Sequence, residues 1–142
     1  MTGDTAIETG ASGPDWDVPE VTRTNLVRYA GASGDMNPMH HDDTLAQSVG
    51  FPSVFAHGMF TAGVLSTYLE RWLGTGSLRS YKVRFKTRVW PGDKLTCAAH
   101  VTGVRDVDGE RVVDVDAQVT RQDGSVAVQA WASAVASGGT AG

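Results

Sequence analysis

Residues 58–73 read GMFTAGVLSTYLERWL, an almost continuously apolar stretch that becomes charged only at Glu70 and Arg71. An α-helix rises about 1.5 Å per residue, so the stretch suits one helix of about 24 Å. A helix that is apolar on nearly every face is expected to be buried all round. Gly74 follows directly and is expected to end it. Such a helix needs a sheet that wraps around it.

The second half of the chain supplies strands for this sheet. Apolar and basic residues alternate over 81–89, which predicts a half-buried strand. Its outward face would be basic, with Lys82, Arg84, Lys86 and Arg88. Alternation over 95–102 and 113–119 predicts two more strands, with a turn at 106–109 between them. The pair Asp123-Gly124 predicts a hairpin before a last strand over 126–135.

These elements predict the fold class. We expect a meander of four strands, preceded by a possible first strand near residues 16–21. The order of helices first and strands second is typical of an α+β fold. The predicted architecture is therefore one curved antiparallel sheet wrapped around one long buried helix.

The first half of the chain contains two short helices and two loops. Thr22 is a good N-cap for a helix that Gly31 should end. Pro38 and its neighbours prevent a regular helix over residues 33–43, so the polar side chains of SGDMNPMHHDD must lie on a loop. A second, brief helix after this loop should end at Gly50.

The composition fits one globular domain of 142 residues. Residues 1–14 lack periodicity and are predicted to be a disordered tail. Residues 137–142 are predicted to be a flexible tail, and residues 15–136 are predicted to form the domain.

The net charge of −4 gives no basic field that would bind nucleic acid. The single Cys97 cannot form an intramolecular disulfide, and no signal peptide or membrane-spanning stretch is recognisable. We expect a cytoplasmic protein.

Polar side chains that could carry chemistry gather in the 33–43 loop and at the start of the long helix. Asp35 and His40 can converge on one water molecule, the carboxylate accepting a hydrogen bond and the imidazole exchanging a proton near neutral pH. Gly58 opens the helix, so its N–H lies at the positive end of the helix dipole and a ligand can approach it closely. Together they predict a site for hydration or hydrolysis, in which Gly58 stabilises an oxyanion.

Three further features have both a structural and a functional interpretation. His57 is expected to pack or form a hydrogen bond beside the helix start rather than to act as a catalyst. Ser66 lies about two turns beyond Gly58, so its hydroxyl could either reach the site or bond back to its own helix. The basic face of the 81–89 strand is expected to be solvated, with docking of phosphate or of an acidic carrier protein as the alternative.

A metal centre is the alternative to a water-activating pair. Asp35, His40, His41 and a neighbouring Asp are suitable ligand types, yet a metal needs three or four convergent ligands and no spacing here fixes that geometry. We expect no metal and no cofactor. His41, Asp42 and Asp43 are expected to be solvated or to cap a helix.

The stretch YAGASGDMNPMH, residues 29–40, followed by AHGM, residues 56–59, resembles the hydratase motif of the MaoC-like dehydratases. These form the (R)-specific enoyl-thioester hydratase family, and the likeness covers about residues 21–135. The chain also looks close to the catalytic subunit of the actinobacterial 3-hydroxyacyl-carrier-protein dehydratase. The resemblance implies the hot-dog fold, a sheet wrapped around one long helix.

The resemblance also implies a reaction and a role for each motif residue. Asp35 and His40 would activate water, and the Gly58 amide would polarise the thioester carbonyl. Support of the pocket or loop would come from Asn37, Ser66 and His57. The implied reaction is reversible hydration of a trans-2-enoyl thioester to an (R)-3-hydroxyacyl thioester, carried on coenzyme A or acyl carrier protein, in fatty-acid or polyketide-type metabolism. A homodimer, or a dimer with a related hot-dog chain, is implied as well.

Two other functions stay open at this stage. A water-activating Asp beside an oxyanion donor could hydrolyse the thioester, which would make the chain a hot-dog thioesterase. The chain could instead be the binding or partner subunit of a heterodimeric dehydratase, although such a subunit needs neither Asp35 nor His40. The carrier, the acyl group and the physiological direction are not determined by the motif.

Overall fold

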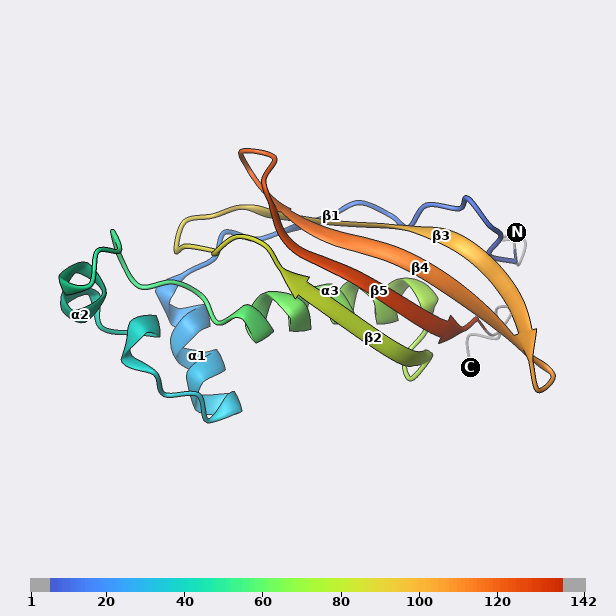
Figure 1. Cartoon of the computed structure of the whole chain (residues 1–142), viewed down its shortest axis with the longest axis horizontal. Coiled ribbons are helices and arrows are strands. Elements are labelled where there is room, and N and C mark those ends of the chain that lie inside the picture. Colours follow the sequence, from blue (N-terminus) through green and yellow to red (C-terminus); the bar gives the residue numbers. More distant parts are fainter. Residues whose placement is uncertain (1–5, 137–142) are drawn as a thin grey trace.

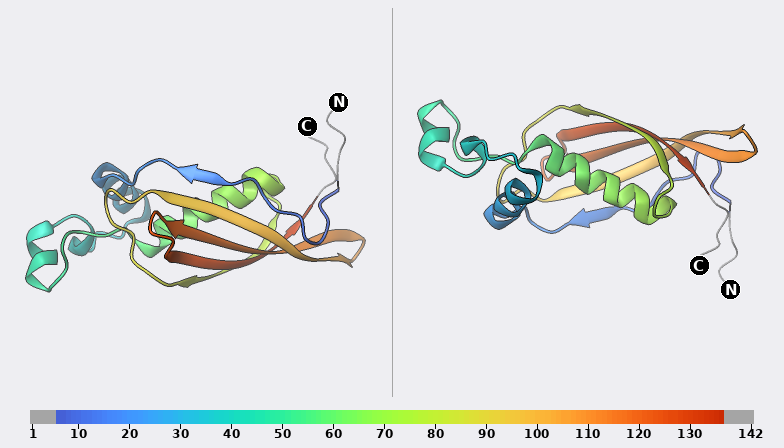
Figure 2. Two further views of the ribbon diagram at one scale, coloured as in Figure 1. Left: turned by 90° about the horizontal axis from the view of Figure 1, so that it is seen from above. Right: turned by 90° about the horizontal axis from the view of Figure 1, so that it is seen from below.

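The computed structural model describes residues 6–136 and shows a five-stranded antiparallel sheet with one long helix against it (Figure 1). The helix α3 (Gly58–Leu73) runs along one face of the curved sheet (Figure 2). This is the α+β hot-dog architecture that the sequence predicted. The strands are β1 (Trp16–Val18), β2 (Leu78–Phe85), β3 (Leu95–Val107), β4 (Glu110–Arg121) and β5 (Val126–Val135).

Small side chains on the inner face of the sheet leave room for the helix. Ala99, Ala117 and Ala130 are paired in register across β3, β4 and β5, and all three are buried. The same core cluster contains Leu65 and Leu69 of α3, both fully buried. Larger residues at the alanine positions would overpack this contact.

The helix α3 has the predicted ends, but it is not buried all round. It begins at Gly58 and is capped by Gly74 at its C-terminus. Met59, Gly63 and Thr67, spaced four residues apart, form an exposed stripe along it, with Met59 at 57% exposure. The expectation was wrong because a single sheet layer covers only one side of a helix.

The predicted meander of four strands is also wrong. The sheet order is β1-β3-β4-β5-β2, so only β3, β4 and β5 form a meander, and β2 pairs with β5 at the opposite edge from β1. Alternation of side chains predicts which face of a strand is buried, but not which strand lies beside it. β2 also ends early, at Phe85, because the N–H groups of Lys86 and Thr87 both point to the Ala127 carbonyl. β1 exists as predicted and is short.

The helix α1 (Arg23–Ser33) starts as predicted and ends later than predicted. Thr22 caps it by accepting the N–H of Asn25 at 3.1 Å. Gly31 does not end the helix, which continues to Gly34 with a φ of 77°. A glycine ends a helix where the chain turns into the left-handed region, and Gly34 is the residue that does so.

The segments around α1 differ from prediction in detail. The helix α2 (Asp43–Ser48) ends at Val49, next to the predicted Gly50. Gly10 and Gly13 donate to the carbonyls of Val101 and Ala99, so this part of the expected N-terminal tail runs beside β3 instead. Residues 1–5 and the predicted tail over 137–142 lie outside the described residues. Within residues 6–136, no helix is long and apolar enough to cross a membrane.

A buried carboxylate ties the segment between β2 and β3 to the β4–β5 turn. The Asp93 side chain, 4% exposed, accepts hydrogen bonds from Arg121 Nε at 2.8 Å and Gln122 Nε2 at 2.8 Å. It also accepts the Trp90 N–H at 2.8 Å. Burial raises the pKa of Asp93, but these hydrogen bonds outweigh it, so the pKa lies below its ordinary value.

We expect Asp93→Asn to lower the free energy of unfolding by about 3 kcal/mol at neutral pH, because it leaves the Arg121 guanidinium with only the exposed carboxylate of Asp123, 3.6 Å away, as counter-charge. A carboxylate whose pKa is lowered in the folded state stabilises the fold at pH values above its unfolded pKa. This stabilisation is lost as the pH falls through the folded pKa. Urea denaturation should therefore show a difference between wild type and variant that shrinks at acidic pH. Asp114→Asn, which breaks the more exposed pair with Arg105, is the control and should cost under about 1 kcal/mol. A difference independent of pH would contradict the expectation.

Candidate functional site

A series of local turns brings Asp35 and His40 together after α1. Asn37 Oδ1 accepts the N–H of Met39 at 3.0 Å and so caps the short 3-10 helix η1 (Pro38–His40). The N–H of Asn37 donates to Asp35 Oδ1 at 3.3 Å. The other carboxylate oxygen, Asp35 Oδ2, lies 4.0 Å from His40 Nε2. Asn37 thus holds the turn that places both side chains.

The tautomer of the His40 ring follows from its hydrogen bond. His40 Nδ1 lies 2.7 Å from the main-chain oxygen of Phe55. A carbonyl oxygen can only accept, so Nδ1 carries the hydrogen and Nε2 of the neutral ring has a lone pair that faces Asp35. The His40 side chain is 10% exposed, whereas that of Asp35 is 52% exposed. The pair therefore joins a fixed, buried base to a carboxylate that solvent can reach.

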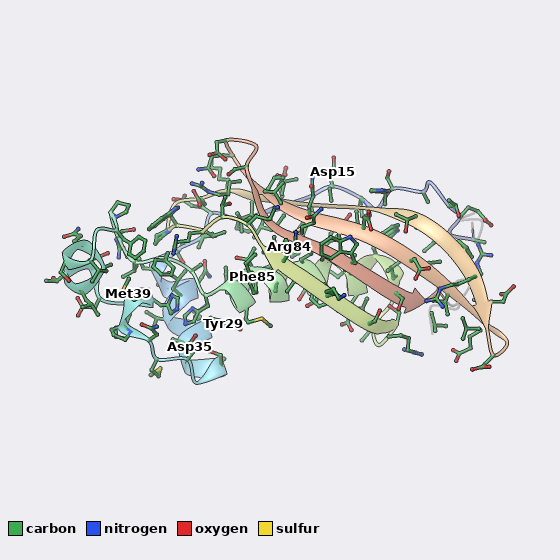
Figure 3. All side chains as sticks on the ribbon, viewed as in Figure 1. Asp15, Tyr29, Asp35, Met39, Arg84 and Phe85 are labelled. Atoms are coloured by element: carbon green, nitrogen blue, oxygen red, sulfur yellow. The ribbon has the colours of Figure 1, made fainter. Side chains whose placement is uncertain are left out.

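His57 contacts both members of the pair. Its ring stacks on that of His40, with centroids 3.7 Å apart and planes at 24°. Its Nε2 lies 3.0 Å from the main-chain oxygen of Asp35, and Tyr29 packs on it at 4.9 Å. His57 is 2% exposed, and its Nδ1 has no hydrogen-bond partner among the described residues. Figure 3 shows Tyr29, Asp35 and Phe85 at the end of the molecule where α1 meets the start of α3.

Gly58 lies where two hollows meet. Its N–H is one of the first of α3, which have no partner within the helix. One hollow, of about 360 Å³, is lined by Asp35 and Tyr29, and we call it the acidic hollow. The other, of about 320 Å³, extends to Lys86 and Arg88, and we call it the basic hollow. Both are lined by His40, His57, Gly58 and Phe85.

The remaining predicted residues lie elsewhere. Ser66 donates to the Gly63 carbonyl at 2.9 Å and lines neither hollow, so the hydroxyl bonds back to its own helix. His41 is exposed near the Met36 carbonyl, and Asp42 caps α2. Asp43 accepts the N–H of Val54 and pairs with Arg23, which ties α2 to the loop before α3.

The ligand set considered for a metal is not assembled. Donor atoms of Asp35, His40 and His57 lie within 4.8 Å of one another, so His57 takes the place that the sequence suggested for His41. One nitrogen of each histidine ring is already used by a main-chain oxygen.

Cys97 is buried in the core, and burial raises the pKa of its thiol to about 12, which excludes it as a nucleophile at neutral pH.

Three aromatic residues of the site were missed by the sequence analysis. Phe55 orients His40 through its main-chain oxygen, Tyr29 packs against His57, and Phe85 covers Gly58. A Cβ on Gly58 would lie only 3.0 Å from the Phe85 ring. Alternation placed Phe85 on the buried face of its strand, but it is the last residue of β2 and is 51% exposed. Only its proximity to Gly58 in the fold reveals its role.

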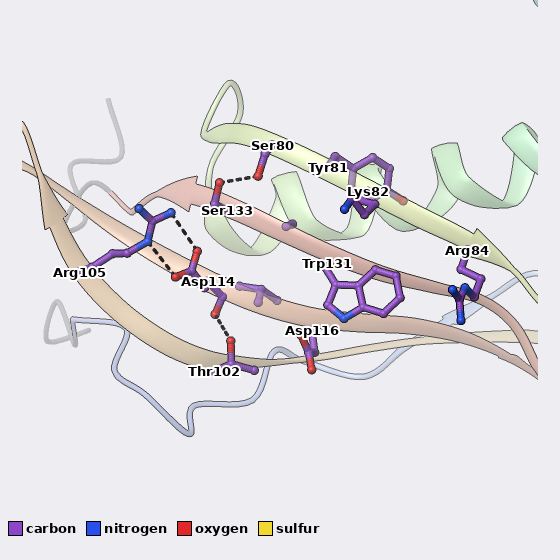
Figure 4. A pocket seen from close by; sticks show the side chains of 12 residues that line it. Ser80, Tyr81, Lys82, Arg84, Thr102, Arg105, Asp114, Asp116, Trp131 and Ser133 are labelled. Atoms are coloured by element: carbon purple, nitrogen blue, oxygen red, sulfur yellow. Dashed lines mark hydrogen bonds and ion pairs between the residues drawn. The ribbon is translucent and has the colours of Figure 1, made fainter.

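The predicted basic strand face is divided between two sides of the sheet. Lys82 and Arg84 line a groove of about 700 Å³ beside Trp131, on the face opposite α3 (Figure 4). Tyr81, the neighbour of Lys82, points to α3 and donates to the Ala62 carbonyl. Beyond the end of β2, Lys86 and Arg88 line the basic hollow instead. Two of the four cations therefore belong to the candidate site.

Comparison with known proteins shows what the chain is similar to. Residues 13–123 match the family described as MaoC like domain. The (R)-specific enoyl-CoA hydratase of Aeromonas caviae is 31% identical over 105 residues, which cover 72% of this chain and 77% of that protein. The 3-hydroxyacyl-thioester dehydratase Y of Mycobacterium tuberculosis is 33% identical over 126 residues, which cover 80% of this chain and 42% of that protein.

The fold agrees as well. The unliganded R-hydratase PhaJ1 from Pseudomonas aeruginosa superposes with a TM-score of 0.81 at 26% identity, covering 92% of this chain and 82% of that structure. The chain spans only 10%, 5% and 60% of the length of three other curated relatives that it matches. The family match covers the loop, the start of α3 and most of the sheet, and hence every candidate site residue. The chain belongs to the MaoC-like domain family.

Proposed function

We propose that the chain catalyses the reversible hydration of a trans-2-enoyl thioester to an (R)-3-hydroxyacyl thioester, carried on coenzyme A or acyl carrier protein. The observation that carries this proposal is the distance of 4.0 Å between Asp35 Oδ2 and His40 Nε2 in a hollow that Gly58 also lines. Hydrogen bonds of about 2.8 Å from one water to both atoms would meet at about 90°, close to the angle between the two hydrogens of water. The activities named for the relatives support the same reaction.

The proposed mechanism assigns one step to each group. Asp35 and neutral His40 each accept a hydrogen bond from the water, which leaves its oxygen lone pair free to attack C3 of the enoyl group. His40 takes one proton of the water as the C3–O bond forms, and the electrons of the double bond move to the thioester oxygen. The N–H of Gly58 and the helix dipole stabilise this enolate oxygen. Transfer of the proton from His40 to C2, on the same face, completes a syn addition.

The test is to incubate the purified protein with crotonyl-CoA and to follow both the enoyl absorbance and free thiol. We expect the absorbance to fall without release of thiol. Release of thiol would show thioester hydrolysis, and the proposal would be wrong. If neither signal changes, crotonyl-acyl carrier protein and longer enoyl thioesters are tested in the same way, and inactivity on all of them would overturn the proposal.

The proposal includes a dimer in the cytoplasm, formed by two copies or with a related hot-dog chain. Two features support a partner: within residues 6–136, β2 pairs with β5 and with no other strand, and the exposed stripe of α3 includes Met59. Static light scattering during gel filtration should give a mass of twice 15.0 kDa for a homodimer. A monomeric mass would mean that a second chain must be supplied or that the dimer is wrong, and co-expression with a related hot-dog chain decides between the two.

A further inference from the structure

The basic hollow is positively charged although the chain as a whole is acidic. The net charge of the chain is −4, yet the lining of this hollow includes Lys86, Arg88 and two histidines and no carboxylate. None of the ion pairs between described residues involves Lys86 or Arg88. The hollow is therefore suited to an anion.

Arg88 is held in place by aromatic rings of the loop between α2 and α3. Its guanidinium lies 4.7 Å from the centroid of Phe51 and 5.2 Å from that of Phe55. A guanidinium that stacks by its face keeps the N–H donors on its edge available for an anion. Phe55 also orients His40 through its main-chain oxygen. Phe55 thus contacts both the Arg88 guanidinium and the proposed base, His40.

The backbone fixes the cationic segment relative to Gly58. The Val89 carbonyl accepts the N–H of Ala56 at 2.8 Å, two residues before Gly58. The N–H of Lys86 donates to the Ala127 carbonyl at 2.9 Å, which holds the segment to the start of β5. The cations and the proposed oxyanion donor therefore belong to one rigid arrangement.

We propose that Lys86 and Arg88 bind the phosphate of the phosphopantetheine arm that carries the acyl group. The inference rests on the proposed function, because the thioester carbonyl must lie at Gly58. With the thioester carbonyl at Gly58, the pantetheine arm would run along the basic hollow that Gly58, Lys86 and Arg88 all line, and long Lys and Arg side chains are suited to reach its phosphate. Arginine binds phosphate through its planar fork and lysine through its point charge. Coenzyme A and acyl carrier protein both present this group.

The test compares a thioester that carries the phosphate with one that keeps the pantetheine arm and lacks the phosphate. Crotonyl-CoA has the phosphate, whereas crotonyl-pantetheine has the same acyl group, thioester and arm without it. We expect Lys86→Gln and Arg88→Gln each to raise the KM for crotonyl-CoA about 10-fold with kcat within about twofold, and to leave kcat/KM for crotonyl-pantetheine unchanged. Lys82→Gln and Arg84→Gln, on the outer face of β2, are the controls and should change neither.

Each other outcome is informative. Equal losses on both thioesters, or no loss on either, would overturn the phosphate site. Crotonyl-acyl carrier protein is assayed alongside: the same rise in KM with both carriers supports the shared phosphate, and a rise only with the carrier protein would contradict it.

Failure of the proposed function is separable from failure of the phosphate site. If the wild type hydrates none of the thioesters, binding of coenzyme A and of pantetheine, which lacks the phosphate, is measured by calorimetry. The phosphate site then predicts tighter binding of coenzyme A than of pantetheine, and loss of that difference when Lys86 and Arg88 are both replaced by Gln. Equal binding of the two compounds by the wild type would overturn it.

Discussion

Asp35→Asn is expected to lower kcat for hydration of crotonyl-CoA by at least about 10²-fold while the fold is retained. The variant keeps the size of the side chain and the acceptor for the Asn37 N–H, so the turn should be unchanged. It replaces one carboxylate oxygen by an NH₂ group, which donates and therefore cannot accept a hydrogen bond from the attacking water. The measurement is the steady-state rate, with circular dichroism and Tm to compare the folds.

His40→Ala should cause a loss of the same order, because it removes the Nε2 that takes the proton. The variant also removes the stack on His57, so its Tm is needed to separate catalysis from stability. His41→Ala is the matched control: His41 is the next residue, exposed and outside both hollows, and its loss should leave kcat within about twofold. Near-normal turnover by Asp35→Asn or by a folded His40→Ala would show that the pair does not activate water.

The parts of the fold that were predicted correctly depend on local patterns. Side chains repeat with a fixed period along a helix or a strand, so the spacing of apolar residues indicates which face is buried. This spacing predicted the helix over 58–73 and the strands β3, β4 and β5. The order of strands depends instead on where the chain crosses the sheet after β2, which spacing does not encode. The same limit applies to Phe85, which fits the alternation yet is 51% exposed at the end of β2.

The candidate site could be predicted in its side chains but not in its main-chain contacts. Asp35, His40 and Gly58 stand out by residue type and position, and the fold brings them around shared hollows. The tautomer of His40 depends on the main-chain oxygen of Phe55, which any residue at that position would offer. Such a contact leaves no signal in residue type. Ser66 had the right helix and spacing, yet its hydroxyl bonds to Gly63.

Gly58→Ala is expected to lower kcat/KM for crotonyl-CoA by about 10²-fold, the value of one preorganised oxyanion donor. A Cβ at this position would lie 3.0–3.2 Å from three atoms of the Phe85 ring, so the ring must move. The methyl group also lies where the thioester oxygen has to approach the N–H. Both effects act on the substrate carbonyl without changing the Asp35–His40 pair.

The two effects are separable by a second substitution. If the Phe85 ring is the obstacle, Phe85→Ala should restore much of the activity of Gly58→Ala, and a double-mutant cycle measures that coupling. If the methyl group itself blocks the carbonyl, Phe85→Ala restores nothing. Gly31→Ala is the matched control: it adds the same methyl group in open space within α1, so activity should be unchanged and stability should rise by about 0.5–1 kcal/mol. Full activity of Gly58→Ala would mean that the thioester oxygen binds elsewhere, and the start of α3 would lose its proposed role in the chemistry.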